Sequence, residues 1–356
     1  MRIVQIVTQL EAAGAQRVAL MLQDGLARSG HPGEVWFLYR KREAFQGRSG
    51  IRAIAGVRPS RLGWLRMLYR LWRELRAARP DVVITHTHYA NALGQLVALF
   101  AGVPRRIAVQ HSVVEIYPPL ARALDRLLGT TGVYSSNAVV SQAVLDSVRY
   151  YPRAYRSRLV LIRNGVMTPS SPVNREAVRR RWSLPLDRPL LVTIGRLDSK
   201  KNQRVLLEAL AALADAHAVI IGEGDERAEL ERCARRLGVE GRVRLLGELP
   251  WEEASAVLRS ADVFVFPSLF EGMPMALIEA LTAGLPIVAS DIPANREAVA
   301  DAGILVAGSR VTDVVDAVRE IIERPEVARH LSARARSRSQ AFSAASMVNG
   351  YLELCS

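Results

Sequence analysis

The chain has little cysteine, no recognisable metal-ligand motif and no long apolar run. Its 356 residues include only two cysteines, Cys233 and Cys355, too few for a disulfide framework or a metal cluster, which predicts a cytosolic protein. No Asp-x-Asp sequence occurs, and histidine, cysteine and aspartate do not cluster at metal-ligand spacing, so we expect neither a metal nor another cofactor. No window approaches the roughly 18 apolar residues of a membrane helix, and the polar start predicts a first strand rather than a secretory signal.

Acidic residues are scarce in the first half of the chain. Residues 1–165 contain 24 Lys+Arg and 9 Asp+Glu, a net charge of +15, whereas residues 166–356 contain 24 and 26, a net charge of −2; together these give the overall +13. A basic half of this kind favours contact with nucleic acid, an anionic membrane or an acidic substrate. Aromatic residues make up only 6% of the chain and no nucleic-acid-binding motif occurs, so nucleic acid is not an expected partner.

Strand and helix patterns alternate through both halves, and the length favours two domains. In the first half, strands are predicted at residues 3–8, 34–39, 81–85, 106–110, 139–141 and 159–162, with helices at 16–28, 61–78 and 91–101. In the second half, strands are predicted at 190–194, 218–221, 243–246, 263–266, 286–290 and 304–306, with helices at 203–214, 226–237, 252–260, 275–283 and 311–323 and a helical tail over 325–355. The pattern predicts two doubly wound α/β domains that face each other across a cleft, with ligands at the carboxyl ends of the strands. Residues 164–172 are interpreted as the linker.

Two carboxylates mark the loop and helix that follow the strand at 263–266. Glu271 lies in a loop punctuated by glycine and proline, and Glu279 lies about a turn and a half into the following helix, which Gly284 ends. Pro274 suits the first helical position, and the free N–H groups of a helix start suit an anion. Gly272 allows close approach of backbone to a ligand, so the carboxylates can reach polar groups beside an anion.

A second loop, residues 194–202, joins a strand to a helix and carries cations. Arg196 and Lys201 beside a helix start suit a diphosphate, because an arginine offers a fork of donors to its oxygens; Lys200 is the competing choice of lysine.

Three histidines follow strands in the first half. His111 ends one strand at the predicted ligand edge, and His86 and His88 end the preceding strand, where they are expected to line the acceptor side.

The motifs in these loops resemble glycosyltransferase family 4, whose members are retaining enzymes with the GT-B fold. The matching residues are Pro267-Ser268, Glu271-Gly272, Pro274, Glu279-Ala280 and Gly284-Leu285-Pro286, together with Gly195-Arg196-Leu197 and Lys201, Gly222-Glu223-Gly224 and Asn164-Gly165-Val166. The chain departs from the family pattern at Ala13, Asn202 and Met167, where Gly, Gly and Asp are usual. The resemblance covers most of the chain and is strongest over residues 190–306.

The resemblance implies a set of site residues. Glu271 would contact donor-sugar hydroxyls, Glu279 the nucleotide ribose, and Arg196 with Lys201 the leaving phosphates, while His111 would lie near the sugar. Further donor contacts are expected at Gly14, Gly195, Gly222, Leu249, Gly272, Met273, Pro274 and Met275. The implied domains are an acceptor-side domain at 1–165, a donor domain at 166–335 and a terminal helix at 336–356 that packs back on the first domain.

The predicted activity is a retaining, metal-independent transfer of sugar from a nucleotide-diphosphate sugar, UDP-sugar first and GDP-mannose second. The acceptor is expected to be a hydroxyl of a lipid-linked glycan in surface polysaccharide or glycolipid synthesis. Two alternatives stay open: a GT-B sugar-nucleotide epimerase, which needs no acceptor, and a basic nucleic-acid-binding protein.

An arginine-rich helix predicts where such an enzyme would meet a membrane. Over residues 61–79, Leu68, Leu71 and Leu75 follow helical spacing, while Arg66, Arg70 and Arg73 share another face. This pattern fits either a core helix with a solvated face or a helix on an anionic membrane surface. With the +15 charge of the first half, it predicts a peripheral protein at the inner membrane face.

Overall fold

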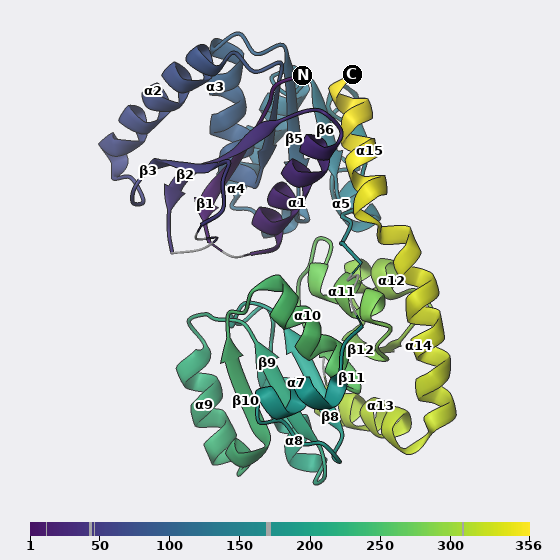
Figure 1. The fold of residues 1–356 in the computed structure, drawn as a ribbon. Helices are drawn as coiled ribbons and strands as arrows, with labels where there is room; N and C mark the ends of the chain where they lie inside the picture. The colour runs from purple at the N-terminus through teal and green to yellow at the C-terminus, as the bar shows by residue number, and fades with distance from the viewer. Residues whose placement is uncertain (12, 43–44, 46, 169–171, 308–309) are drawn as a thin grey trace. The chain divides into compact units, whose positions relative to one another are not determined.

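The computed structural model describes residues 1–356 except 12, 43–44, 46, 169–171 and 308–309. It consists of two compact units, drawn in Figure 1: unit 1 comprises Met1–Gly165 and Ala344–Ser356, and unit 2 comprises Val166–Ser343. Part of the predicted linker, residues 169–171, lies outside the described residues. Within the described chain, no helix combines the length and the apolar character needed to cross a bilayer.

Unit 1 is built on a parallel sheet of seven strands in the order β3-β2-β1-β4-β5-β6-β7. The strands are β1 (Ile3–Leu10), β2 (Gly33–Arg40), β3 (Ile51–Ala55), β4 (Val82–His86), β5 (Arg105–Gln110), β6 (Ser136–Val139) and β7 (Leu159–Leu161). The strand order reverses between β1 and β4, which pair in parallel from Ile3↔Val82 to Val7↔His86. This reversal creates a switch point at the carboxyl ends of β1 and β4, where open α/β sheets bind ligands.

Helices cover both faces of this sheet. They are α1 (Gly14–Arg28), α2 (Arg61–Ala78), η1 (Ala90–Gly94), α3 (Gln95–Phe100), η2 (Val114–Ile116), α4 (Pro119–Thr130), α5 (Gln142–Ser147), α6 (Arg153–Arg156) and α15 (Ala344–Cys355). α2 packs Leu71 and Leu75 on the face that carries Ile6, and α1 covers the opposite face. α15 runs beside α1 (Figure 1). A Cβ at Gly25 would stand 2.2 Å from Val348, so a residue without a side chain permits this close contact.

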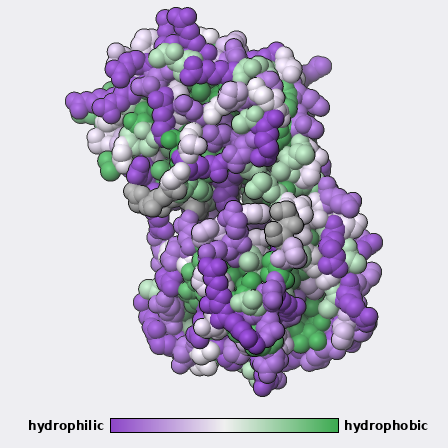
Figure 2. Space-filling view, viewed as in Figure 1, coloured by the Kyte–Doolittle hydropathy of each residue, from purple (hydrophilic) through white to green (hydrophobic). Residues whose placement is uncertain are grey.

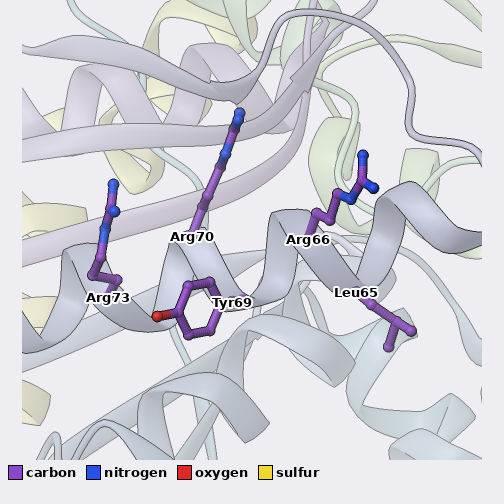
Figure 3. A pocket seen from close by; sticks show the side chains of 5 residues that line it. All are labelled: Leu65, Arg66, Tyr69, Arg70 and Arg73. Carbon is purple, nitrogen blue, oxygen red and sulfur yellow. The ribbon is translucent and has the colours of Figure 1, made fainter.

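The outward surface of α2 combines arginines with apolar side chains. Leu65 and Tyr69 are 67% and 61% exposed, although Met67, Leu71 and Leu75 on the other side of the helix are buried. Figure 2 shows hydrophilic side chains over the visible part of this region, with paler apolar ones between them. In Figure 3, Arg66, Arg70 and Arg73 extend to one side of the helix and Leu65 to the other, around a shallow hollow. α2 therefore has one apolar stripe in the core and another on the surface.

Unit 2 contains a parallel sheet of six strands in the order β10-β9-β8-β11-β12-β13. Its strands are β8 (Leu190–Ile194), β9 (His217–Ile221), β10 (Val243–Gly247), β11 (Val263–Phe266), β12 (Ile287–Ser290) and β13 (Ile304–Val306). Its helices are α7 (Arg175–Arg181), α8 (Arg204–Ala212), α9 (Arg227–Arg236), η3 (Glu240–Arg242), α10 (Trp251–Ser260), α11 (Met275–Ala283), α12 (Pro293–Val299), α13 (Val311–Glu323), α14 (Pro325–Ser339) and η5 (Gln340–Phe342). The order reverses between β8 and β11, which places the switch point there.

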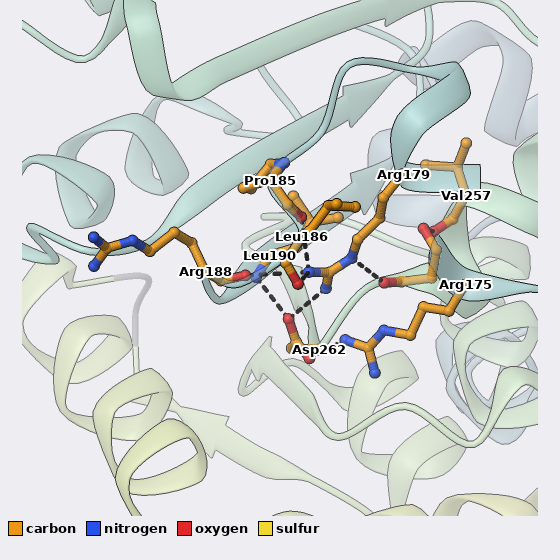
Figure 4. A network of polar contacts seen from close by, with 9 residues as sticks. Arg175, Arg179, Pro185, Leu186, Arg188, Leu190, Val257 and Asp262 are labelled. Atoms are coloured by element: carbon orange, nitrogen blue, oxygen red, sulfur yellow. Dashed lines mark hydrogen bonds and ion pairs between the residues drawn. The ribbon is translucent and has the colours of Figure 1, made fainter. Parts of the chain in front are cut away.

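A buried arginine fixes α7 to the amino end of this sheet (Figure 4). Arg179 is 3% exposed and donates to the carbonyls of Ser260 (2.9 Å), Pro185 (2.9 Å), Arg188 (3.2 Å) and Leu186 (3.4 Å). Its Nη2 lies 2.7 Å from Oδ2 of Asp262, and the same oxygen accepts the N–H of Leu190 at 2.8 Å. The planar guanidinium satisfies several acceptors at once, so this cluster has a structural role at the edge opposite the switch point.

The predicted fold class, two doubly wound α/β domains, is confirmed, but several predicted elements need correction. The pattern missed β3, α4, α7 and α12. The strand expected at 139–141 lies at Ser136–Val139, and Ser141 instead caps α5 by accepting the N–H of Val144 at 3.2 Å. The helix expected at 336–356 is interrupted: α14 stays with unit 2, where Arg336 packs against Gly284, and only α15 belongs to unit 1.

Candidate active site

Lys201 and Glu271 meet at the switch point of unit 2. Lys201 follows β8 and Glu271 follows β11, and the two strands are neighbours in the sheet. Lys201 Nζ lies 2.5 Å from Glu271 Oε1 and 5.2 Å from the centre of the Phe266 ring. The side chains are 22% and 10% exposed, so solvent reaches the pair only partly. The Leu269 N–H donates to the Lys200 carbonyl at 2.8 Å, which ties the two loops together.

Arg196 lies in the same loop as Lys201. Its Nε is 2.7 Å from Oδ2 of Asp198, and its side chain is 43% exposed. Oδ1 of Asp198 accepts the backbone N–H groups of Lys200 (3.1 Å) and Lys201 (3.2 Å). These bonds fix the turn that presents both cations, while Lys200 itself is exposed. Lys201 therefore makes the contact with Glu271, and Lys200 does not.

Helix α11 starts at Met275, four residues after Glu271. Gly272, Met273, Pro274 and Met275 are all buried, and Glu279 is partly exposed on the helix. No side chain described by the structure caps this helix, and its first turn contains no acidic residue. Uncapped N–H groups at a helix start favour an anion. Pro274 was predicted at the first helical position, but it stands at the N-cap, one residue earlier in the helix than expected.

The glycine loops after β8, β9 and β10 pack on one another through backbone atoms. Gly222 has φ +141°, and a Cβ there would stand 2.0 Å from the Gly195 carbonyl oxygen. The Gly222 N–H also donates to the Gly247 carbonyl at 2.8 Å. Gly222 is thus required by the fold itself. Gly195 has more room, since the atoms nearest to a Cβ there would be side-chain atoms of Lys201 at 3.5 Å. Leu249, one of the predicted donor contacts, is partly buried after β10.

His86 and His111 are hydrogen-bonded in unit 1. His86 Nδ1 lies 2.9 Å from His111 Nε2, and His86 Nε2 lies 2.9 Å from Gln5 Oε1. His86 is fully buried, whereas His111 is partly buried. Burial lowers the pKa of His111 to about 4, and burial together with the neighbouring His111 lowers the pKa of His86 well below its usual value. Because its side chain is fully buried, His86 cannot line an acceptor surface as predicted, and it contacts His111 instead.

His88 lies in a cluster of rings at the same edge of the sheet. Its ring centre is 4.2 Å from that of Tyr89 and 5.2 Å from that of Tyr117, and Tyr89 lies 6.0 Å from Trp64 of α2. Burial lowers the pKa of His88. Tyr89 remains partly open to solvent, at 43%. The cluster therefore offers a partly exposed aromatic surface beside the switch point of unit 1.

Sequence reasoning missed Gln5 and Thr87 at this edge. Thr87 has φ +74°, which is strained for a β-branched residue and is typical of functional segments; its Oγ1 is 2.5 Å from that of Thr8. A glutamine between the apolar pairs Ile3-Val4 and Ile6-Val7 was the available signal for Gln5. Gly14, a predicted donor contact, is exposed at the first position of α1 after Ala13.

Comparisons with known proteins agree with this arrangement. Residues 174–338 match the family described as Glycosyl transferases group 1, and residues 12–168 match Glycosyltransferase Family 4. The chain is 30% identical over 310 residues to the alpha-maltose-1-phosphate synthase of Mycolicibacterium smegmatis, covering 78% of this chain and 79% of the relative. It is 33% identical over 302 residues to a GDP-mannose-dependent alpha-(1-6)-phosphatidylinositol dimannoside mannosyltransferase of Mycobacterium tuberculosis, covering 80% and 70%.

The fold has solved counterparts as well. Anabaena HepE in complex with UDP and glucose superposes with a TM-score of 0.86 at 19% identity, covering 99% of this chain and 98% of that one. The two doubly wound units and these likenesses define a GT-B glycosyltransferase that uses a nucleotide sugar. Within that class, the chain belongs to the family 4 type.

Proposed function

We propose that this glycosyltransferase is a retaining, metal-independent enzyme that transfers a sugar from a UDP-sugar, with GDP-mannose as the alternative donor, to a hydroxyl of a lipid-linked glycan. The observation that carries the donor side of the proposal is the meeting of Lys201, Glu271 and the uncapped start of α11 at one switch point.

Fixed cations support metal independence. The diphosphate of a nucleotide sugar gains negative charge as the sugar leaves, and either a divalent metal or protein cations can stabilise that charge. Lys201 and Arg196 sit on a turn fixed by Asp198, and α11 begins four residues after Glu271, which pairs with Lys201. These groups supply positive charge at fixed positions, which is the property that a leaving diphosphate requires.

In the proposed reaction, the bond between the anomeric carbon and the phosphate oxygen breaks. The acceptor oxygen bonds to the anomeric carbon on the face that the phosphate leaves, and the proton of the acceptor hydroxyl passes to the departing phosphate oxygen. Glu271 would hold sugar hydroxyls and Glu279 the ribose. His111 would contact a hydroxyl of the sugar.

The base of the nucleotide is the less constrained part of the donor. The loops at Gly222 and Leu249 would hold it through backbone groups, which say little about its identity. HepE was solved with UDP, whereas the mycobacterial relative is named GDP-mannose-dependent. A thermal-shift panel of UDP, GDP and their sugar conjugates tests the donor: a selective rise with UDP-sugars is expected, and no rise with any nucleotide would contradict the proposed site.

The surface of α2 supports a membrane-associated acceptor. Leu65 and Tyr69 are exposed between arginines, and the Tyr69 ring stacks on Trp72 with centres 5.8 Å apart. An amphipathic helix with this composition lies in the interface of an anionic bilayer, where each cation contributes roughly 1 kcal/mol.

The buried, unpaired thiols Cys233 and Cys355 fit a reducing compartment. We therefore place the enzyme on the cytoplasmic face of the membrane.

Liposome binding tests this placement. The protein should sediment with phosphatidylglycerol-containing vesicles at low salt and less at high salt, and Arg66→Glu/Arg70→Glu/Arg73→Glu should reduce binding at least about tenfold. The matched control changes charge by the same amount on exposed arginines of unit 2, as Arg235→Glu/Arg236→Glu/Arg329→Glu, and should bind as the wild type does. Equal loss in both triple variants would show that net charge, not the α2 surface, causes binding.

Transfer itself is tested with a membrane extract as acceptor and a labelled nucleotide sugar. Label should move to the lipid fraction with the wild type, and Lys201→Ala should abolish the transfer. Conversion of the nucleotide sugar to an isomer without any acceptor would instead identify an epimerase.

A further inference from the structure

A continuous chain of hydrogen bonds joins a backbone carbonyl of α1 to His111. Gln5 Nε2 donates to the Ala19 carbonyl at 2.9 Å, Gln5 Oε1 faces His86 Nε2 at 2.9 Å, and His86 Nδ1 faces His111 Nε2 at 2.9 Å. Gln5 is 2% exposed and His86 is 0% exposed. Water cannot reach the buried groups of this hydrogen-bonded series. Each donor in it must therefore face an acceptor, and each acceptor a donor.

The donor and the acceptor of every hydrogen bond in this series follow from the Ala19 carbonyl at its start. A backbone carbonyl only accepts, so the Gln5 amide must turn its NH₂ toward Ala19 and its oxygen toward His86. An amide oxygen also only accepts, so the proton of neutral His86 lies on Nε2 and its Nδ1 is a bare acceptor. His111 must then donate from Nε2 to that atom. The remaining nitrogen of neutral His111, Nδ1, therefore carries a lone pair.

Both rings are neutral near pH 7, since burial lowers the pKa of each. Among the described residues, no group forms a hydrogen bond with His111 Nδ1. The ring thus keeps one unused acceptor, because its hydrogen bond with His86 uses the other nitrogen.

We propose that Gln5 and His86 are positioning residues that hold His111 in its Nε2–H tautomer, so that Nδ1 accepts a hydrogen bond from a hydroxyl of the donor sugar. This inference rests on the proposed function of the site. A neutral acceptor at a fixed position favours sugars with a hydroxyl there and disfavours deoxy or fluoro analogues, which cannot donate. Gln5, in the first strand of the chain, would thereby determine selectivity for the sugar without touching it.

The tautomer can be measured directly in the full chain labelled with ¹⁵N-histidine. At pH 7, His111 is expected to give a protonated Nε2 and an unprotonated Nδ1, assigned by loss of its signals in His111→Asn. An Nδ1–H form or an even mixture of the two tautomers would overturn the proposal. This measurement needs no substrate and no change to the Gln5 network.

Kinetics supply the second readout. Gln5→Leu removes the group that orients His86, and we expect mixed His111 tautomers with about a tenfold lower kcat/KM for the nucleotide sugar. Binding of the nucleoside diphosphate, which lacks the sugar, should be unchanged. The control is Gln95→Leu, because Gln95 is equally buried in unit 1 but bonds Thr85 and the Ile107 carbonyl instead. Gln95→Leu should keep both the single tautomer and the wild-type selectivity.

The outcomes separate two kinds of failure. Gln5→Leu with a single Nε2–H tautomer and full activity would overturn the positioning role. Wild-type protein that neither binds nor transfers a nucleotide sugar would overturn the proposed function, whatever the tautomer. If Gln5→Leu does not fold, the spectrum of the wild type decides the question alone.

Discussion

Lys201 Nζ and Glu271 Oε1 lie 2.5 Å apart although 70 residues separate them in sequence. The ammonium proposed to bind a diphosphate is held by the carboxylate proposed to bind the sugar. A partly buried ion pair resists the loss of either partner, because the remaining charge is left uncompensated. Donor binding would therefore exchange partners: the diphosphate takes Lys201, and Glu271 becomes available to sugar hydroxyls.

The exchange predicts opposite effects on nucleotide binding and on transfer. Glu271→Gln removes the negative charge that competes for Lys201, so UDP should bind a few-fold more tightly by calorimetry. Sugar transfer should fall at least about tenfold, because a charged acceptor for the hydroxyls is lost. Lys201→Ala should weaken both. The neighbouring Lys200 is exposed, and Lys200→Ala should leave both near wild type; weaker UDP binding in Glu271→Gln would contradict the exchange.

Two glycines in adjacent loops should differ in their tolerance of a methyl group. At Gly222, alanine would combine a positive φ with a Cβ 2.0 Å from the Gly195 carbonyl oxygen, and we expect a loss of more than about 1 kcal/mol in the free energy of unfolding. In Gly195→Ala the nearest atoms to the new methyl group would be those of Lys201, at an ordinary contact distance of 3.5 Å, and the change should cost less than about 0.5 kcal/mol. Urea titration of both variants tests this, and equal stability would refute the packing argument.

The same loops show what the sequence could reveal. Strand, loop and helix follow one another over a short stretch of sequence in both loops, so the local pattern alone predicts that Arg196, Lys201 and Glu271 lie at the carboxyl edge of a sheet. The contact of Gln5 with His86 joins residues 81 positions apart, and no local pattern encodes it. α7 was missed for a related reason: its sequence, REAVRRR, is strongly charged, and burial of Arg179 among carbonyls defines its place.

The buried histidines predict that unit 1 loses stability in mild acid. The pKa values of folded His86 and His111 lie below the usual value near 6.5, so above about pH 6.5 both states are neutral and stability is full. As pH falls toward about 4, the two histidines become protonated in the unfolded chain while they stay neutral in the folded chain. The free energy of unfolding should fall by up to about 1.4 kcal/mol per pH unit for each histidine.

Asp125 acts in the opposite sense and must be separated from this effect. Burial raises the pKa of its carboxyl, so the folded chain gains a proton first as pH falls, which adds stability. Urea titrations of the wild type, His111→Asn and Asp125→Asn at several pH values resolve the two. The slope should be shallower in His111→Asn and steeper in Asp125→Asn; an unchanged slope in His111→Asn would contradict the assignment.

The Arg179 cluster predicts a strong effect far from any proposed ligand. Arg179→Met removes the donor to several carbonyls and the buried cation that pairs with Asp262, and the expected loss is about 3 kcal/mol or more. Arg179→Lys should be only a partial rescue, because an ammonium cannot reach acceptors on several sides at once. The adjacent Arg180 is 68% exposed and pairs with Glu176 of its own helix, so Arg180→Met should cost less than about 0.5 kcal/mol. Since α7 lies at the amino end of β8 and β11, Arg179→Lys should retain wild-type UDP affinity in its folded fraction. Reduced affinity in that fraction would mean that the cluster, contrary to its position, shapes the loops at the other end of the sheet.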